Sequence, residues 1–428
     1  MLDYPEMIHL TPTGPVDASI EVPGSKSLTN RALILASLAE GWSVLEKSLI
    51  AEDSQVMIEA LCHLGFSIKV EGTTFRVEGN GGRIPARAAE LDLRLSGTSI
   101  RFLTALVAIG RGRFRLDGTE RMRQRPIQDL LNALVGLGVK AGTQFKTGSP
   151  PVIVEAAGIP GGEARIAGGR SSQYLSALLM VAPYASAPVT LTVTGELQSK
   201  PFVDMTLKLM GDFGVEVERD GYAQFSVRPA RYRARPYRIE GDAMAAGYFW
   251  AAAAATGGRI RIENLGRHSL QGDCRLAWVL ERMGCRVTWD NESCELIGPP
   301  DGQLKGGRFD LNDMPDQAQT LAVLGLFADA PVEIDNIWNL RIKETDRLSA
   351  LATELRKLGA QVWEGKDSIV IHPLEARPTG IVIDTYDDHR MAMAFAVAGL
   401  RIDLSLRDPS CVRKTYPGFF EDWAALVA

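Results

Sequence analysis

The chain has 428 residues, of which 46% are hydrophobic and 23% are charged, and its formal net charge at pH 7 is −5. This length predicts two or more domains with sizeable cores, and the composition excludes a disordered or collagen-like chain. The acidic balance argues against non-specific binding to nucleic acid, so basic residues that cluster in motifs carry information.

The start of the chain lacks the basic and apolar regions of a signal peptide. The longest apolar run, Ala243 to Thr256, is shorter than the roughly 20 residues of a membrane-spanning helix, so we expect a buried helix there. The cysteines form no C-x-x-C pair and the histidines show no metal-ligand spacing. We therefore expect reduced thiols, a cytoplasmic location and no bound metal.

The first motif, Pro23 to Arg31, separates a strand-like run (Ala18 to Val22) from an apolar helical run (Ala32 to Ala39). Glycine and small hydroxyl residues at a helix start leave backbone N–H groups uncovered, and the helix dipole adds positive charge there. Lys26 and Arg31 add full charges. The motif predicts an anion site for phosphate or carboxylate, and the alternative is a plain N-cap with solvated basic residues.

A polar helix start of this kind recurs along the chain at intervals of roughly 71 to 75 residues. An apolar helical run follows each start, then an amphipathic helix that ends at a glycine, and then alternating strands. We predict an α/β fold of six strand–helix–strand–helix–hairpin repeats; unrelated helices with coincidental spacing are the alternative. The helix starts are Gly24-Ser25-Lys26, Ser96-Gly97-Thr98, Ser171-Ser172-Gln173, Asp242-Ala243-Met244, Pro315-Asp316-Gln317 and Asp388-His389-Arg390.

The repeats predict two domains. Residues 24–240 hold three repeats, and residues 241–428 hold the other three together with the N-terminal residues 1–23. The sixth repeat ends at its second helix, so we expect the strands of Ile8 to Val22 to complete it. The chain then crosses twice between the domains, and this arrangement would permit hinge closure over an active site in the cleft between them.

Basic residues follow the second strand of most repeats. Each alone is typical of a solvated loop, but repetition at one structural position favours convergence on a site for highly anionic ligands. Among the nearby carboxylates, Asp316 and Glu344 are the candidates for acid–base chemistry, with a structural ion pair as the alternative for each. The basic residues are Arg121, Arg123, Arg125, Lys200, Arg267, Arg341, Lys343, Arg347, Arg413 and Lys414.

The ordered set of motifs resembles the EPSP synthase family, the 3-phosphoshikimate 1-carboxyvinyltransferases, nearly end to end. The family's fold is a two-domain inside-out α/β barrel. The resemblance implies transfer of the enolpyruvyl group of phosphoenolpyruvate to the 5-hydroxyl of shikimate 3-phosphate with release of phosphate, as a monomer without metal, nucleotide or other cofactor. The motifs are Gly24-Ser25-Lys26-Ser27 with Asn30-Arg31, Arg121-Met122 with Arg125-Pro126, Ser171-Ser172-Gln173, Ser199-Lys200-Pro201, Lys343-Glu344-Thr345-Asp346-Arg347 and Asp388-His389-Arg390-Met391-Ala392-Met393.

The resemblance also implies roles for single residues. Catalysis would use Lys26, Asp316 and Glu344. Shikimate 3-phosphate would contact Lys26, Ser27, Arg31, Ser171, Ser172, Gln173, Ser199, Asp316, Asn339 and Lys343. Phosphoenolpyruvate would contact Lys26, Gly97, Arg125, Gln173, Arg347, Arg390 and Lys414.

The sequence departs from the family pattern at three positions. Leu95 stands where the family usually has Asn, Phe202 replaces a frequent Tyr, and Phe102 occupies a position often held by Pro. Gly97 is retained, which predicts sensitivity to glyphosate. Two alternatives stay open: the related UDP-N-acetylglucosamine enolpyruvyl transferase, which commonly has a reactive loop cysteine where this chain offers only Cys62, and a non-catalytic phosphometabolite-binding protein on the same scaffold.

Overall fold

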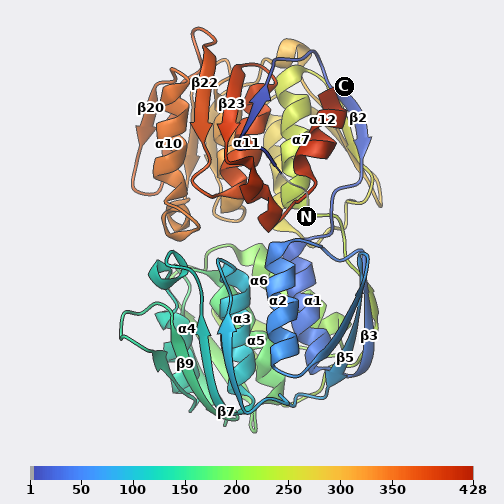
Figure 1. Cartoon of the computed structure of the whole chain (residues 1–428), viewed down its shortest axis with the longest axis vertical. Helices are drawn as coiled ribbons and strands as arrows, with labels where there is room; N and C mark the ends of the chain where they lie inside the picture. The colour runs from blue at the N-terminus through green and yellow to red at the C-terminus, as the bar shows by residue number, and fades with distance from the viewer. Residues whose placement is uncertain (1–3, 428) are drawn as a thin grey trace. The chain divides into compact units, whose positions relative to one another are not determined.

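The structure is a computed structural model that describes residues 4–427. Contacts within the chain divide it into two compact units. One unit runs from Gly24 to Ile239, and the other takes in the chain up to Pro23 and again from Glu240 onward. The first and last segments of the chain therefore belong to the same unit (Figure 1).

The unit from Gly24 to Ile239 is built of sheets that flank a bundle of helices (Figure 1). Its sheets have the strand orders β14-β3-β5-β4, β6-β7-β9-β8 and β10-β11-β13-β12, and in each the first two strands pair in parallel while the others are antiparallel. The strands are β3 (Glu40–Glu46), β4 (Ser67–Glu71), β5 (Thr74–Asn80), β6 (Ala88–Asp92), β7 (Arg111–Asp117), β8 (Lys140–Thr143), β9 (Val152–Ala157), β10 (Gly162–Ala167), β11 (Val189–Thr194), β12 (Glu218–Asp220), β13 (Gln224–Val227) and β14 (Pro236–Arg238).

The other unit repeats this plan with the strand orders β16-β17-β15-β2, β18-β19-β21-β20 and β1-β23-β22. Across residues 4–427 the chain thus forms six small sheets, which confirms the predicted α/β repeat. The strands are β1 (Met7–Leu10), β2 (Asp17–Ile20), β15 (Arg259–Ile262), β16 (Arg286–Trp289), β17 (Cys294–Ile297), β18 (Gly307–Asp310), β19 (Val332–Asp335), β20 (Val362–Glu364), β21 (Ile369–Ile371), β22 (Thr379–Asp384) and β23 (Asp403–Arg407).

The helices are of the two expected kinds, one buried on all sides and one amphipathic. The buried helices pack on one another within each unit, and α7 has every residue buried. The buried helices are α1 (Lys26–Leu38), α3 (Gly97–Ala108), α5 (Ser172–Val181), α7 (Ala243–Thr256), α9 (Ala318–Gly325) and α11 (His389–Gly399). The amphipathic helices are α2 (Glu52–His63), α4 (Gln128–Gly136), α6 (Lys200–Asp212), α8 (Arg275–Arg282), α10 (Arg347–Lys357) and α12 (Phe419–Val427).

The expectation that Ile8 to Val22 completes the sixth repeat was wrong for its second half. β1 pairs antiparallel with β23 of that repeat, but β2 pairs in parallel with β15 and so completes the fourth repeat. The physical reason lies between the two strands, where Pro12 and Pro15 cannot donate to a sheet ladder and redirect the chain. In the Gly24–Ile239 unit, too, the two ends of the segment meet in one sheet, because β14 at its end pairs in parallel with β3 near its beginning.

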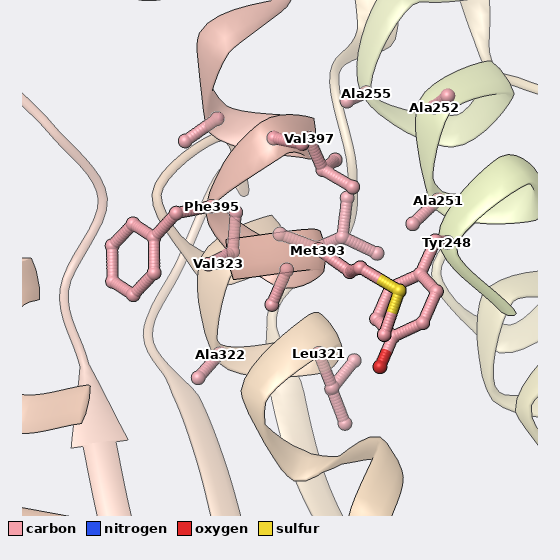
Figure 2. Packing of buried hydrophobic residues seen from close by; sticks show 14 of the residues in the cluster. Tyr248, Ala251, Ala252, Ala255, Leu321, Ala322, Val323, Met393, Phe395 and Val397 are labelled. Carbon is pink, nitrogen blue, oxygen red and sulfur yellow. The ribbon is translucent and has the colours of Figure 1, made fainter. Parts of the chain in front are cut away.

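Alanines on α7 let the buried helices of the unit that contains residues 240–427 approach closely (Figure 2). Ala251 of α7 lies beside Met393 of α11, and Ala255 lies toward Val397 of the same helix (Figure 2). Protein interiors are packed as densely as organic crystals, so a larger side chain at such a position has no room.

Replacing Ala252, which is fully buried, with leucine is expected to lower the free energy of unfolding by about 2 kcal/mol through overpacking. Urea denaturation of both proteins measures this change. Ala424→Leu on the exposed side of α12 is the matched control and is expected to shift stability by less than about 0.5 kcal/mol. Equal stability of the two variants would contradict close packing of α7.

Two further observations concern residues 4–427. No helix in that range is long and apolar enough to cross a membrane, and no group of three or more His, Cys, Asp or Glu side chains there is suited to hold a metal ion. The cysteines carry free thiols, and Cys62 lies on the exposed side of α2.

Candidate functional site

The first predicted motif forms the start of α1 within the Gly24–Ile239 unit. A Cβ atom at Gly24 would lie 1.9 Å from the carbonyl oxygen of Lys47, so only glycine fits at this close approach. Ser25 is the N-cap of α1 and accepts a hydrogen bond from the backbone N–H of Leu28 at 3.5 Å. Lys26 then begins the helix, and its Nζ lies 3.0 Å from Oδ2 of the buried Asp53.

Arg31 is almost completely buried and connects α1 to α6. Its Nε donates to Oγ1 of Thr206 at 2.7 Å, and its other nitrogens donate to the carbonyl oxygens of Ser27 and Phe202 at 3.0 and 3.2 Å. The guanidinium also faces the rings of Phe102 and Phe202, at 5.2 and 6.0 Å from their centroids. Burial lowers the pKa of Arg31 to about 9, so it remains a cation at neutral pH. Two departures from the family pattern thus pack against this cation.

The first turns of α3 and α5 are joined by side-chain hydrogen bonds. Gln173 accepts from Nη1 of Arg101 at 2.6 Å, and its Nε2 donates to Oγ1 of Thr98 at 3.3 Å. Ser171 caps α5 by accepting from the backbone N–H of Gln173 at 3.3 Å, and Ser172 is buried as the first residue of that helix. Sequence reasoning missed Arg101, although a charge within an otherwise apolar helical run is a usable signal.

Gly97 provides the space that Arg125 occupies. A Cβ atom at Gly97 would lie only 2.5 Å from Nη2 of Arg125, whose Nη1 donates to the carbonyl oxygen of Leu95 at 3.3 Å. The backbone carbonyl of Leu95 therefore holds the guanidinium of Arg125, although the apolar side chain of Leu95 cannot form a hydrogen bond. Ser199 is buried as the N-cap of α6. We call Lys26, Arg31, Arg101, Arg125 and Gln173 the Lys26 group.

The second unit holds a tighter network around Arg347, the first residue of α10. Its Nε and Nη2 donate to the two carboxylate oxygens of Asp388 at 2.6 and 3.1 Å, which is a bidentate pair. Nη1 reaches Asp316 at 3.0 Å and Nη2 reaches Glu344 at 2.8 Å. Asp388 also caps α11 by accepting from the backbone N–H of Arg390 at 3.0 Å. Arg347 has only 1% of its side chain exposed, so these ion pairs are buried.

Asp316 accepts from three cations. Lys343 and Arg347 reach its Oδ1 and Arg390 reaches its Oδ2, each at 3.0 Å. Burial alone would raise the pKa of Asp316, but Arg390, Lys343 and Arg347 hold it well below its usual value, so the carboxylate is ionised. Burial lowers the pKa of Lys343, and the neighbouring Asp316 opposes that shift.

Glu344 and Lys414 complete the network, with Nζ of Lys414 2.7 Å from Oε1 of Glu344. We call this network the Arg347 cluster. Its members are Asp316, Lys343, Glu344, Arg347, Asp388, Arg390 and Lys414. Asn339 lies apart from these contacts, buried in the 3-10 helix Trp338–Ile342, and its Oδ1 has no hydrogen-bond partner among residues 4–427.

The structure does not bring every predicted basic residue into these two sets. Arg123 pairs with Asp117 on an exposed loop, and Arg341 pairs with Asp346 and Glu364. These two form local ion pairs instead, which differs both from the predicted convergence and from the alternative of a solvated loop charge. The carboxylate of Asp53, which pairs with Lys26, was not singled out from the sequence, because a first-turn helix acid gives no sign of its tertiary partner.

The family model described as EPSP synthase (3-phosphoshikimate 1-carboxyvinyltransferase) matches residues 10–423. Relatives named 3-phosphoshikimate 1-carboxyvinyltransferase include one from Trichormus variabilis, 47% identical over 96% of this chain and 97% of its own length, and one from Laribacter hongkongensis, 44% identical over 99% and 100%. A solved EPSP synthase from Acinetobacter baumannii superposes with a TM-score of 0.83 at 23% identity, covering 98% of both chains.

Proposed function

Because the chain belongs to the EPSP synthase family, and so transfers the enolpyruvyl group of phosphoenolpyruvate to the 5-hydroxyl of shikimate 3-phosphate, we propose that the Lys26 group and the Arg347 cluster act together on this one pair of substrates. The reaction releases phosphate and belongs to the shikimate pathway, which leads to chorismate and the aromatic amino acids.

The observation that carries the proposal is the chemistry of the two sets. Both substrates are phosphorylated carboxylates, so a protein that holds them together needs many cations, and arginine suits bidentate capture of phosphate and carboxylate. Each set supplies buried or half-buried cations on rigid elements: α1, α3 and the loop before α4 in one unit, and α10 and α11 in the other. Rigid placement favours tight binding of a charged ligand.

We assign the acceptor, shikimate 3-phosphate, to side chains from both units. The hydroxyl groups of the serines suit its phosphate, and Asp316 is suited to accept a hydrogen bond from its 5-hydroxyl. The proposed acceptor contacts are Lys26, Ser27, Arg31, Ser171, Ser172, Gln173, Ser199, Asp316, Asn339 and Lys343.

The donor, phosphoenolpyruvate, is assigned mainly to the arginines. The proposed donor contacts are Lys26, Gly97, Arg125, Gln173, Arg347, Arg390 and Lys414. Arg347 and Arg390 are already paired with carboxylates within the Arg347 cluster, so the donor would have to take over part of those pairings. If the donor replaces a carboxylate as the partner of an arginine, no buried arginine is left without a counter-charge, either before or after binding.

The chemistry proceeds by addition and elimination. The methylene carbon of the donor gains a proton and the acceptor hydroxyl attacks the carbon that bears phosphate; the tetrahedral intermediate then loses a proton and phosphate. Asp316 and Glu344 are the proposed acid–base pair, and the ionised state of Asp316 suits it to accept the hydroxyl proton. Lys26 would stabilise the developing charge and assist proton movement.

A phosphate-release assay tests the function against its nearest rival. The purified chain is given phosphoenolpyruvate alone, with shikimate 3-phosphate, or with UDP-N-acetylglucosamine. We expect phosphate only with shikimate 3-phosphate, and release with the nucleotide sugar instead would contradict the proposal. We also propose a monomeric enzyme that acts in the cytoplasm, which size-exclusion chromatography and cell fractionation would test.

Gly97→Ala is expected to raise the KM for phosphoenolpyruvate about tenfold, because the added methyl group would displace the guanidinium of Arg125 and weaken a charge-assisted hydrogen bond. Steady-state kinetics with saturating shikimate 3-phosphate measure the change, and the parent protein is expected to be inhibited by glyphosate in the same assay. Gly142→Ala is the matched control, because nothing lies within 4 Å of its added carbon. An unchanged KM in Gly97→Ala would remove Arg125 from the donor site.

A further inference from the structure

Asp273 is a buried carboxyl group that the proposed mechanism does not use. It lies in the 3-10 helix Gly272–Cys274 just before α8, with 5% of the residue exposed. Gln271, two residues earlier, connects this segment to the start of α7. Its Oε1 accepts a hydrogen bond from the backbone N–H of Ala243 at 3.0 Å, and its Nε2 donates to the carbonyl oxygen of Gly241 at 2.7 Å. Asp273 is therefore held on a rigid segment.

Two buried atoms of complementary kind lack hydrogen-bond partners at this place. Among residues 4–427, Oδ1 of Asp273 has no hydrogen-bond partner, and Nε of Arg390 makes no hydrogen bond within the usual distance, although the hydroxyl of Tyr248 lies close enough to favour the charged guanidinium. The two residues are electrostatic neighbours, and Arg390 uses a different nitrogen, Nη2, to reach Asp316. No ion pair within 4.0 Å joins the two side chains among residues 4–427, but an unpartnered buried donor and an unpartnered buried acceptor are each costly, so a side-chain rotation that brought them together would be favourable.

We propose that Asp273 is a positioning residue for the donor site, where its carboxylate holds the Arg390 guanidinium when Asp316 turns from Arg390 to the acceptor hydroxyl. This inference rests on the proposed function, in which Arg390 binds phosphoenolpyruvate. The need for such a residue follows from the pairing: Asp316 cannot hold Arg390 and accept the hydroxyl proton with the same oxygen at full strength. A buried arginine without a counter-charge would be costly, and a second carboxylate beside it removes that cost.

The charged groups around Asp273 set the pH at which it can act. Burial raises the pKa of Asp273 to about 7, and Asp316 of the Pro315–Gln317 segment adds to this rise. Arg390 of α11 opposes it, Asp242 at the N-cap of α7 raises it further, and Lys343 opposes it. Asp273 should therefore hold Arg390 as a carboxylate above pH 7 and lose that charge below it.

Asp273→Asn tests the proposal, because it keeps the size of the side chain and removes its charge. We expect the KM for phosphoenolpyruvate to be about tenfold higher than in the parent protein at pH 8 and about equal to it at pH 6, where the parent carboxyl group is itself protonated. The kcat and the affinity for shikimate 3-phosphate alone should change less than about twofold. The ratio of the two KM values at one pH does not depend on the protonation state of the substrates' phosphate groups, because both proteins meet the same substrate.

Control variants separate a positioning role from a structural one. Asp273→Glu should restore part of the donor affinity at pH 8, and the exposed Asp220→Asn should behave as the parent at both pH values. Equal donor KM in Asp273→Asn and the parent at pH 8 would overturn the inference. So would a uniform loss of kcat and of both affinities at both pH values. If instead Arg390→Gln left the donor KM unchanged, the proposed function of Arg390 would fail, and this outcome is independent of Asp273.

Thermal unfolding checks that the variant folds. The unfolded carboxyl group loses its proton near pH 3.8 and the folded one near pH 7, so the parent loses stability as the pH rises between these values. Asp273→Asn lacks this loss, so at pH 8 its melting temperature should be no lower than that of the parent. A much lower value there would indicate that the Asp273 carboxylate is required for folding, contrary to a positioning role.

Discussion

Replacing Glu344 with glutamine is expected to lower kcat by about 100- to 10,000-fold, the range typical of a lost general acid or base, while shikimate 3-phosphate still binds. Glutamine keeps the shape of the side chain but can neither take nor give a proton at neutral pH. Arg347 would keep its pairs with Asp388 and Asp316, so the Arg347 cluster should stay assembled. Steady-state phosphate release gives kcat, and titration calorimetry gives the affinity for the acceptor.

Glu364→Gln is the matched control for this variant. Glu364 also pairs with an arginine, Arg341, at 3.0 Å, but it lies outside the Arg347 cluster. We expect it to turn over within about twofold of the parent, because its pair with Arg341 takes no part in the Arg347 cluster. If Glu344→Gln turned over as fast as Glu364→Gln, Glu344 would have no part in the acid–base chemistry.

Asp388→Ala is expected to lower the free energy of unfolding by about 3 to 5 kcal/mol, the usual cost of breaking a buried ion pair from one side. The variant leaves Arg347, with 1% of its side chain exposed, without its bidentate partner, and it also removes the N-cap of α11. Denaturant unfolding followed by circular dichroism measures the change. Activity should fall as well, since Arg347 and Arg390 would lose their anchored geometry.

A second aspartate isolates the part of this effect that comes from the buried pair. Asp346 caps α10 by accepting from the backbone N–H of Ser349 at 3.1 Å, but 41% of its side chain is exposed. Asp346→Ala should therefore cost only about 1 to 2 kcal/mol, the sum of a lost cap and of its partly exposed pair with Arg341. A loss in Asp388→Ala no larger than that in Asp346→Ala would show that the Arg347–Asp388 pair does not stabilise the fold.

The repeat could be predicted from the sequence because its signals are local. Each signal lies within one segment of the chain: a polar helix start before an apolar run, or a glycine after an amphipathic helix. Accordingly, α7 begins and ends where the apolar run Ala243 to Thr256 does. The partner of β2 could not be predicted in this way. It pairs with β15 more than two hundred residues away, and nothing in Asp17–Ile20 specifies which strand it joins.

The candidate site likewise contains residues that local motifs predict and residues that only tertiary contacts reveal. Lys26, Asp316 and Arg390 stand in ordered motifs, so their residue types and spacing pointed to them. Asp53 and Asp273 are ordinary acids near helix starts in the sequence. Only the folded chain brings Asp53 beside Lys26 and buries Asp273 where the charge of Arg390 acts on it. Arg101 is intermediate: a charge inside an apolar run is visible in the sequence, but its partner Gln173 is not.

The central claim is that side chains from both units hold the same two substrates. A crystal structure of the chain with shikimate 3-phosphate and an unreactive analogue of phosphoenolpyruvate tests it most directly. We predict that Lys26 and Arg125 from one unit, and Asp316 and Arg390 from the other, lie within hydrogen-bonding distance of these two ligands in a single complex. Ligands contacted by residues of only one unit would contradict the account.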